Sequence, residues 1–441
     1  MGKCTFKGGI HPYDGKELSK DKPIKELFPA VGEMVFPLSQ HIGAPAVPVV
    51  AKGDYVLAGQ LIAEAGGFVS ANIHSSVSGT VKSIEPRTLA TGGKCNSIII
   101  ENDGEFKEVE YTPKKLEELS KEEVLQRIKD AGVVGMGGAG FPTNVKLSPK
   151  NPEGIDYIIV NGAECEPFIT SDHRLMLEET QSIIDGADEI MKYLDLKKTY
   201  IGVEENKPDA IEALKKTIDE NGHSADMEVK VLRARYPQGA ERVMVYEITG
   251  KVLKAGMLPA DVGVILSNVT TISFIGKYLK TGMPLVEKRI TVDGNAVKSP
   301  KNIIVPIGAR IADVVASCGG YSAEPKKILM GGPMMGRAVY SDEFPVIKNN
   351  NAILIFDGDQ ALIPEETACI KCGRCYSACP FDLMPVAIAE AYDTKNTKRL
   401  EALKVTECME CGSCSYICPA RRPLSFINKM SKGFLKEAAN K

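Results

Sequence analysis

The sequence predicts a multidomain chain of mixed α/β and α+β class, and three observations lead to this prediction. Short strand-like segments punctuated by Pro and Gly fill the first quarter of the chain. A glycine-rich loop opens a middle region of alternating strands and helices, and two runs of four cysteines stand near the C-terminus. The length of 441 residues suggests about three domains, or four.

Composition argues against several classes of protein. The net charge of −3 and the absence of Trp give no support for nucleic-acid binding. The longest apolar runs, such as 353–356, have the length of a strand, so we expect no membrane-spanning helix. The first nine residues are polar and rich in glycine, so we expect no signal peptide. The cysteine content indicates a reducing compartment, and we expect a soluble or peripheral protein.

Residues 1–112 are expected to form a β-rich domain. Short strands are predicted at 47–50, 55–57, 61–63, 79–84 and 97–101. The stretch from Pro48 to Ile84 resembles the barrel-sandwich hybrid of biotinyl and lipoyl domains. Those carrier domains present a modifiable lysine on a hairpin tip, whereas 72–76 contains none. We therefore expect a platform rather than a swinging arm.

A helix is predicted from 121 to 131, because Ser120 and Glu123 form a capping box and Gly132 follows. The next segment, 135–146, reads G-M-G-G-A-G-F-P-T-N-V-K. Glycines let backbone amides approach a phosphate or a planar ring closely. The segment is not G-x-G-x-x-G, so an ordinary Rossmann motif is not indicated, and a tight turn remains the alternative.

Alternating strands and helices follow the glycine loop. The expected elements are a strand at 157–160, a helix at 174–194, a strand at 199–203, a helix at 208–222, a strand at 228–232 and a strand within 262–271. The first strand ends in N-G-A-E-C-E-P, at the edge where α/β folds bind ligands. The segment R-Y-P-Q-G-A-E-R at 235–242 lies between the last two strands.

The pattern becomes strand-rich again after residue 285. The expected elements are strands at 289–294 and 302–308, a helix at 311–318 and a strand at 327–336. This region resembles the soluble-ligand-binding β-grasp (SLBB) module. Its M-G-G-P-M-M-G segment is either a ligand loop or, as we favour, part of a spacer that aims the C-terminal domain.

The motif C-x2-C-x2-C-x3-C-P occurs twice. The first copy holds Cys369, Cys372, Cys375 and Cys379, and the second holds Cys408, Cys411, Cys414 and Cys418. This is the spacing of bacterial two-cluster ferredoxins, which hold two [4Fe–4S] clusters. In that pattern the fourth cysteine crosses over, so Cys418 joins the first three of the first copy and Cys379 those of the second. Zinc and disulfides are the alternatives, but zinc sites usually show two separated pairs.

An ordered set of motifs carries a wider resemblance. G-x-G-G-A-G-F-P-T-x-x-K, N-x-x-E-x-E-P, Y-x-x-G-x-E and S-N-V-x-T resemble the NADH- and FMN-binding flavoprotein subunit of respiratory complex I. With F-K-G-G-I-H-P at 6–12, the barrel and the cysteine runs, nearly the whole chain resembles the C subunits of Rnf electron-transport complexes. The resemblance implies a barrel-sandwich hybrid at 1–112, a Rossmann-like FMN/NADH domain at 113–284, a β-grasp module at 285–345 and a two-cluster ferredoxin domain at 346–441.

The resemblance also implies a set of binding residues. The residues under FMN and the nucleotide would be Gly135, Gly137, Gly138 and Gly140, with Phe141 facing a ring and Lys146 a phosphate. The flavin would be bound by Asn161, Asn268 and Thr271. The flavin edge and the nucleotide hydroxyls would be lined by Glu164 and Glu166, and the pocket would be completed by Tyr236 and Glu241. The complex I pattern usually has Arg at Met136, an acid at Ala163 and Glu at Ala240, so this chain lacks three of its charges.

The implied function is that of an enzyme, an NADH:ferredoxin oxidoreductase-type ion translocase subunit. Electrons would pass between NADH, FMN, two [4Fe–4S] clusters and the other subunits of a membrane complex, with ferredoxin as an indirect partner and Na+ or H+ as the translocated ion. The expected place is peripheral, on the cytoplasmic side of the cell membrane. The alternatives are a corrinoid reductase, whose barrel comes last, a soluble diaphorase subunit, and an iron–sulfur relay without enzymatic activity.

The segment after Pro419 is basic and amphipathic. Phe426, Ile427, Met430 and Phe434 follow helical spacing. Such a segment suits an anionic membrane surface or an acidic partner. The alternative, which we favour, is a helix packed on the ferredoxin domain with its lysines in water.

Overall fold

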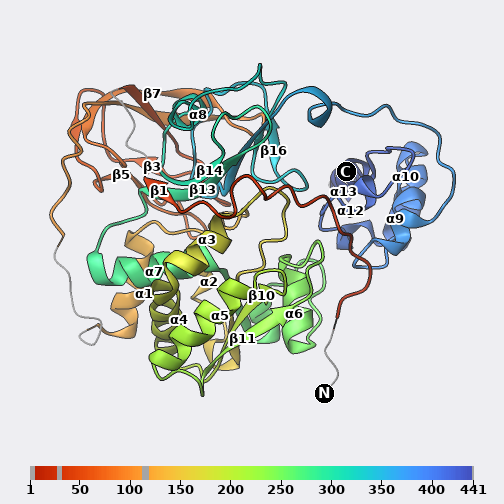
Figure 1. Ribbon diagram of the computed structural model, residues 1–441, viewed down its shortest axis with the longest axis horizontal. Coiled ribbons are helices and arrows are strands. Elements are labelled where there is room, and N and C mark those ends of the chain that lie inside the picture. The colour runs from red at the N-terminus through yellow and green to blue at the C-terminus, as the bar shows by residue number, and fades with distance from the viewer. Residues whose placement is uncertain (1–4, 27–31, 112–118, 440–441) are drawn as a thin grey trace.

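The structure, a computed structural model, describes residues 5–26, 32–111 and 119–439. In Figure 1 a strand-rich part lies above a helix-rich part, and a small helical domain stands to one side of both. None of the helices in these ranges is long and apolar enough to cross a bilayer.

Two small antiparallel sheets build the N-terminal barrel. Their strand orders are β2-β8-β7-β4 and β3-β5-β6. The strands are β2 (Gly32–Pro37), β3 (Val47–Pro48), β4 (Tyr55–Val56), β5 (Leu61–Glu64), β6 (Ile73–His74), β7 (Gly79–Thr88) and β8 (Lys94–Asn102). The five strands expected here all occur. The β7–β8 hairpin is longer than expected because its pairing continues out to Thr88 and Lys94.

The β-grasp module is a six-stranded sheet of order β1-β14-β13-β17-β15-β16. Its elements are β1 (Lys25–Glu26), β13 (Glu287–Asp293), β14 (Lys301–Pro306), α8 (Ile311–Ser317), β15 (Lys327–Met330), β16 (Arg337–Val339) and β17 (Ala352–Phe356). The expected boundary at 345 falls inside this sheet, since β17 pairs with both β13 and β15. All five residues of β17 are buried, and such a strand needs neighbours on both sides.

The barrel and the β-grasp sheet share one hydrophobic core, although about 180 residues separate them in the chain. Phe36 of β2 is fully buried in it with Ile290, Val305 and Ile353 of the sheet. The Ser76 hydroxyl also donates to the Ile307 carbonyl across this contact (2.5 Å). The two modules therefore form a single body.

The middle domain is a four-stranded parallel sheet of order β11-β10-β9-β12 with helices around it. Its elements are α1 (Lys121–Asp130), α2 (Thr143–Lys146), β9 (Tyr157–Asn161), α3 (Ser171–Glu178), α4 (Thr180–Leu194), β10 (Thr199–Glu204), α5 (Pro208–Glu220), β11 (Met227–Leu232), α6 (Glu241–Thr249), β12 (Val264–Asn268) and α7 (Val269–Thr281). The predicted capping box of Ser120 and Glu123 is present at α1.

The helix expected over 174–194 is interrupted and forms α3 and α4. Glu179 leaves the helical region, with φ −132°, and its carboxylate pairs with Arg289 of β13 (2.5 Å) and Lys277 of α7 (2.7 Å). A tertiary ion pair that no local pattern encodes accompanies this break.

The C-terminal domain contains α9 (Arg374–Ser377), α10 (Pro385–Asp393), α11 (Thr397–Ala402), α12 (Ser413–Tyr416) and α13 (Leu424–Ala439). The two cysteine runs adopt the same local conformation. Gly373 and Gly412 have φ values of 75° and 82° and precede the one-turn helices α9 and α12. The left-handed backbone, which glycine tolerates without strain, lets each loop turn back on its own cysteines.

The N-terminal segment joins all three bodies, and Figure 1 shows it passing from the C-terminal domain to the six-stranded sheet. Ile10 forms a β-bridge with Tyr236, and the Gly9 amide donates to the Ala378 carbonyl (2.9 Å). Lys16 donates to the Glu164 carbonyl (2.6 Å) and Lys22 to that of Pro300 (2.7 Å). The F-K-G-G-I-H-P motif therefore begins a strap between domains.

Gly186 in α4 and Gly433 in α13 form a matched pair for testing the helix packing. A Cβ on Gly186 would overlap the Ile272 carbonyl oxygen of α7, whereas a Cβ on Gly433 meets no atom within 4 Å. We expect Gly186→Ala to lower the free energy of unfolding by about 1–3 kcal/mol and Gly433→Ala to raise it by up to about 1 kcal/mol. Thermal unfolding followed by circular dichroism measures both changes. Equal melting temperatures would contradict the close α4–α7 contact.

Candidate functional site

A cavity of about 840 Å³ opens where the barrel, the middle domain and the β-grasp module meet. The residues expected from sequence that line it are Gly135, Gly137, Gly138, Phe141, Lys146, Asn161, Glu164, Glu166, Tyr236, Glu241 and Asn268. The structure thus brings together residues spread over more than 130 positions of the chain. A cavity of this size at the carboxyl ends of parallel strands is typical of a cofactor site.

The glycine loop forms one wall of the cavity. Gly138 has φ +128°, and a Cβ added there would point into open space. Gly137 lies against the Asn268 side chain, which an added Cβ would approach to 3.0 Å. The loop therefore leaves a flat recess that a ligand can fill. If a residue with a side chain replaced the glycine, that side chain would occupy the recess instead.

Gly140 and Thr271 lie behind the loop, outside the residues that line the cavity. The Thr271 hydroxyl accepts a hydrogen bond from the Met136 amide (3.0 Å), and Thr271 is fully buried. A Cβ on Gly140 would approach Asn349 to 3.2 Å. Both residues hold the shape of the loop rather than face the cavity.

Lys146 and Glu241 form a charged pair on the cavity wall. The Lys146 ammonium donates to the Leu266 carbonyl (2.7 Å) and lies 3.7 Å from the Glu241 carboxylate. Burial lowers the pKa of Lys146, and the Glu241 charge opposes that shift. A phosphate entering the cavity would meet this cation beside the Glu241 carboxylate, which partly balances its charge.

The strand-end motif after β9 places three polar side chains at the cavity. The Asn161 amide donates to the Gly239 carbonyl (2.8 Å). Glu164 accepts from the Asp172 amide (2.7 Å) at the start of α3, and Glu166 accepts from the Met335 amide (2.9 Å) of the M-G-G-P-M-M-G segment. Burial raises the pKa of each glutamate to about 7. Both carboxylates line the cavity, but each already has backbone partners.

The M-G-G-P-M-M-G segment is part of this cavity and not only a spacer. Met330, Gly331, Gly332 and Met335 line it together with Arg337. The Glu166 carboxylate lies where a Cβ on Gly332 would be. The glycines of this segment are visible in the sequence and were the signal that it lines a ligand site.

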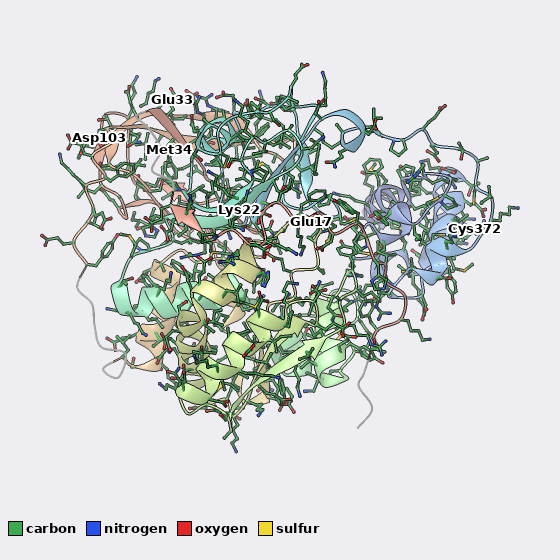
Figure 2. The ribbon with its side chains drawn as sticks, viewed as in Figure 1. Glu17, Lys22, Glu33, Met34, Asp103 and Cys372 are labelled. Carbon is green, nitrogen blue, oxygen red and sulfur yellow. The ribbon has the colours of Figure 1, made fainter. Side chains whose placement is uncertain are left out.

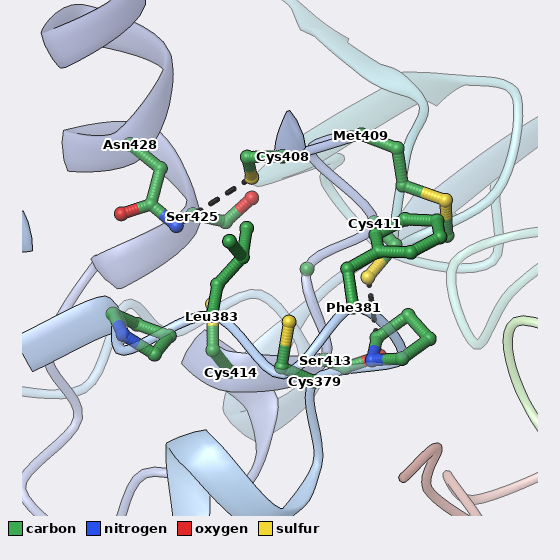
Figure 3. Close-up of a pocket in the computed structure, with 13 residues that line it drawn as sticks. Cys379, Phe381, Leu383, Cys408, Met409, Cys411, Ser413, Cys414, Ser425 and Asn428 are labelled. Carbon is green, nitrogen blue, oxygen red and sulfur yellow. Dashed lines mark hydrogen bonds between the residues drawn. The ribbon is translucent and has the colours of Figure 1, made fainter. Parts of the chain in front are cut away.

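Four thiols of the C-terminal domain surround a small hollow of about 20 Å³. Cys379 comes from the first run, and Cys408, Cys411 and Cys414 come from the second. Figure 3 shows Cys379 facing the second-run cysteines across this hollow. Asn428 of α13 donates to the Cys408 sulfur (3.5 Å), and the Glu410 amide does the same (3.4 Å). The crossover pattern predicts that these four cysteines hold one cluster.

The other group is more exposed. Cys375 and Cys418 lie in a buried cluster that also contains Cys414, while Cys372 is exposed and lies at the outer edge of the molecule in Figure 2. The Lys371 amide donates to the Cys369 sulfur (3.4 Å), which repeats the Glu410–Cys408 contact. Among the described residues, no three His, Cys, Asp or Glu side chains are close enough to share a single metal ion.

Sequence reasoning missed how closely the cavity adjoins the cysteine hollow. Met409 lines both. The Tyr236 hydroxyl donates to the Cys411 carbonyl (2.7 Å), and Arg242 binds the Glu407 carboxylate (2.6 Å) and lies 4.0 Å from the centre of the Phe381 ring. No spacing rule links these residues, because they come from different domains.

The C-terminal helix packs on the cysteine domain. Lys432 donates to the Cys408 carbonyl (3.0 Å), and the Phe434 ring meets Tyr392 edge-on. Helix α13 continues through Gly433 without a break. The four apolar side chains expected on one face of this helix do not all pack on the domain, because Phe426 and Met430 are 62% and 43% exposed. Packing on the ferredoxin domain, the alternative that we favour for this segment, therefore describes the face of the helix that is turned toward that domain.

Models of four domain families match the chain in order. They are the RnfC barrel sandwich hybrid domain at residues 4–105, the Nuo51 FMN-binding domain at 128–277, the SLBB domain at 289–338 and the 4Fe-4S dicluster domain at 361–419. These are the four modules that the sequence motifs suggested, in the same order.

Curated relatives match most of the chain. It is 45% identical over 383 residues to the C subunit of the proton-translocating ferredoxin:NAD(+) oxidoreductase complex of Clostridium ljungdahlii, covering 86% of this chain and 83% of that protein. It is 43% identical to the Na(+)-translocating counterpart of Acetobacterium woodii, covering 89% and 88%. A chain of NAD+-reducing [NiFe]-hydrogenase in the H2-reduced state has a TM-score of 0.50 at 16% identity, covering 74% of this chain and 63% of that one, which shows a shared fold.

Cysteine variants test the grouping of the thiols. We expect Cys418→Ala and Cys369→Ala to damage the same iron centre, because the crossover pattern assigns both sulfurs to one cluster. Cys379→Ala should damage the other one. Electron paramagnetic resonance of the reduced full-length protein distinguishes the two centres. Loss of different centres in Cys418→Ala and Cys369→Ala would rule out the crossover.

Proposed function

Because this chain belongs to the family of C subunits of ion-translocating ferredoxin:NAD(+) oxidoreductase complexes, we propose that it is the complex's point of exchange with NAD(H). One observation carries this proposal. The large cavity and the hollow of four cysteines share Met409 as a wall. A site for two-electron chemistry thus adjoins a site for one-electron chemistry.

The residues of the cavity fit FMN. The recess at Gly138 has room for a ligand where a side chain would lie, and the loop lines the same cavity as Lys146. When bound, FMN accepts two electrons as a hydride and can release them singly. The chain's own task is to hold flavin and nicotinamide face to face and to exclude water between them.

The thiols of Cys379, Cys408, Cys411 and Cys414 would hold the [4Fe–4S] cluster next to the flavin. Those of Cys369, Cys372, Cys375 and Cys418 would hold the second cluster. The exposure of Cys372 supports a second site that faces a partner. Tyr236 and Arg242 fix the near site against the cavity through backbone and side-chain bonds.

The acidic residues of the cavity suit NADH. Glu164, Glu166 and Glu241 line the space that a dinucleotide would enter. Carboxylates accept hydrogen bonds from ribose hydroxyls and repel an additional phosphate. NADH is a cytoplasmic reductant, so we place the chain at the cytoplasmic side of the membrane complex, with ferredoxin as the distant redox partner.

Three rival functions make different demands on the structure. An iron–sulfur relay without flavin needs no cavity of 840 Å³ beside its cysteines. A soluble diaphorase subunit needs neither the barrel nor the 6–12 motif, yet the barrel shares its core with the β-grasp module and Ile10 pairs with Tyr236 beside the cavity. A corrinoid reductase has its barrel last, and here it is first.

Gly138→Val tests the flavin site. We expect this variant to lose most of its FMN and its NADH oxidation while both iron centres persist, because the branched side chain would enter the recess. Gly222→Val is the matched control, since Gly222 also has a positive φ (+75°) and open space around it and lies after α5, away from the cavity. Both carry backbone strain of about 1–3 kcal/mol. The absorption spectrum with and without NADH reports flavin content and reduction. Equal flavin content in the two variants would contradict the proposal.

Reduction kinetics test the order of the two iron centres. In Cys379→Ala, we expect NADH to reduce the remaining centre much more slowly than in the wild type, although dithionite should reduce it normally. In Cys372→Ala, NADH should still reduce the centre that adjoins the cavity at the wild-type rate. Freeze-quenched electron paramagnetic resonance follows each centre. A normal NADH-driven rate in Cys379→Ala would refute the proposed order.

A further inference from the structure

Three carbonyl groups of the glycine loop are bound from outside its own domain. The Lys288 ammonium of β13 donates to the Met136 carbonyl (3.0 Å). The Asn349 amide, from the segment before β17, donates to the Gly138 carbonyl (2.7 Å). The Ile42 amide of the barrel donates to the Gly140 carbonyl (3.1 Å). Two of these three donors belong to the β-grasp module and one to the barrel.

The opposite side of the same peptides faces the cavity. The amides of Gly137 and Ala139, which share a peptide with the Met136 and Gly138 carbonyls, donate to no acceptor within the described part of the chain, and both residues are exposed and line the cavity. Because the N–H and C=O of a peptide point in opposite directions, carbonyls fixed outward turn their amides inward. Inward amides of one loop form a concave site for an anion.

Lys288 adds a charge behind this row of amides. It is only 1% exposed, and the Met136 carbonyl accepts from its ammonium. Burial lowers its pKa to about 7, and the charge of Asp172, which lines the cavity, opposes that shift. A buried cation without a carboxylate in contact is costly, and an anion held by the loop would offset that cost.

We propose that the β-grasp module is part of the cofactor site, with Lys288 and Asn349 as positioning residues that hold the glycine loop as a receptor for a ligand's phosphate. This inference rests on the proposed function and adds to it the group that the loop recognises. The phosphate belongs either to the flavin or to the dinucleotide, and both are phosphate esters that amides and a nearby cation bind alike. The module therefore does more than set the distance between domains.

The variants for the test are Lys288→Met and Asn349→Ala in the full-length protein. The matched control for the lysine is Lys348→Met, because Lys348 is equally buried, burial also lowers its pKa to about 7, and it donates to the Asn72 and Gly132 carbonyls outside the loop. The control for the asparagine is Asn295→Ala, whose amide donates to the Asp357 carbonyl (3.0 Å) in the same module.

The main measurement is the ratio of the affinities for FMN and riboflavin, obtained by fluorescence titration of protein stripped of its flavin. These ligands differ only by the phosphate, so a general loss of folding lowers both affinities together. We expect Lys288→Met and Asn349→Ala to lower the ratio by about tenfold, the equivalent of one hydrogen bond to a charged group. Both controls should keep the wild-type ratio.

A second arm, carried out on flavin-loaded protein, measures KM for NADH. If the loop binds the dinucleotide instead, Lys288→Met and Asn349→Ala will raise KM by a similar factor at unchanged kcat, and the FMN-to-riboflavin ratio will stay as in the wild type. Either pattern supports the inference. An unchanged ratio together with an unchanged KM overturns it, and so does an equal loss in Lys348→Met. A wild-type protein that binds neither flavin would overturn the proposed function as well.

Discussion

The architecture depends on one hydrophobic core that two distant parts of the sequence must complete together. The barrel around Phe36 and the β-grasp strands around Ile290 and Ile353 bury their apolar side chains against each other. The chain leaves the barrel, forms the whole middle domain and then returns to the same core. Because the chain returns in this way, the glycine loop of the middle domain is held against both the barrel and the β-grasp module. The cavity is the space between these three parts.

The C-terminal domain is attached in a different way. Its contacts with the middle domain combine a small apolar cluster that includes Tyr236 and Cys411 with directed polar bonds, such as Tyr236 to the Cys411 carbonyl and Arg242 to Glu407. The N-terminal strap adds Gly9 to the Ala378 carbonyl. Directed bonds to backbone atoms fix position and orientation more narrowly than apolar contact does. Such precision suits a domain whose cysteines must stay close to a redox site.

The electrostatics around the cavity are balanced by backbone groups as much as by ion pairs. Glu164 and Glu166 accept backbone amides, whereas Lys288 and Lys348 donate to backbone carbonyls. Burial moves the pKa of each of these four groups to about 7. Charges held in this way can respond to a bound anion or to a change of flavin charge, because backbone groups hold them and nearby charges, such as Lys16 at the two glutamates and Asp172 at Lys288, only oppose the effect of burial.

The sequence by itself determined the class of the fold, the order of its modules and the identity of the cysteine runs. These are local signals, because ligand spacing, glycine loops and strand periodicity are written in short segments. It did not reveal the break at Glu179, the place of β17 in the β-grasp sheet, or the carbonyl contacts of Lys288 and Asn349. Only the tertiary structure decided these features, because each depends on a partner more than 100 residues away in the chain or, for β17, on which strands lie beside it.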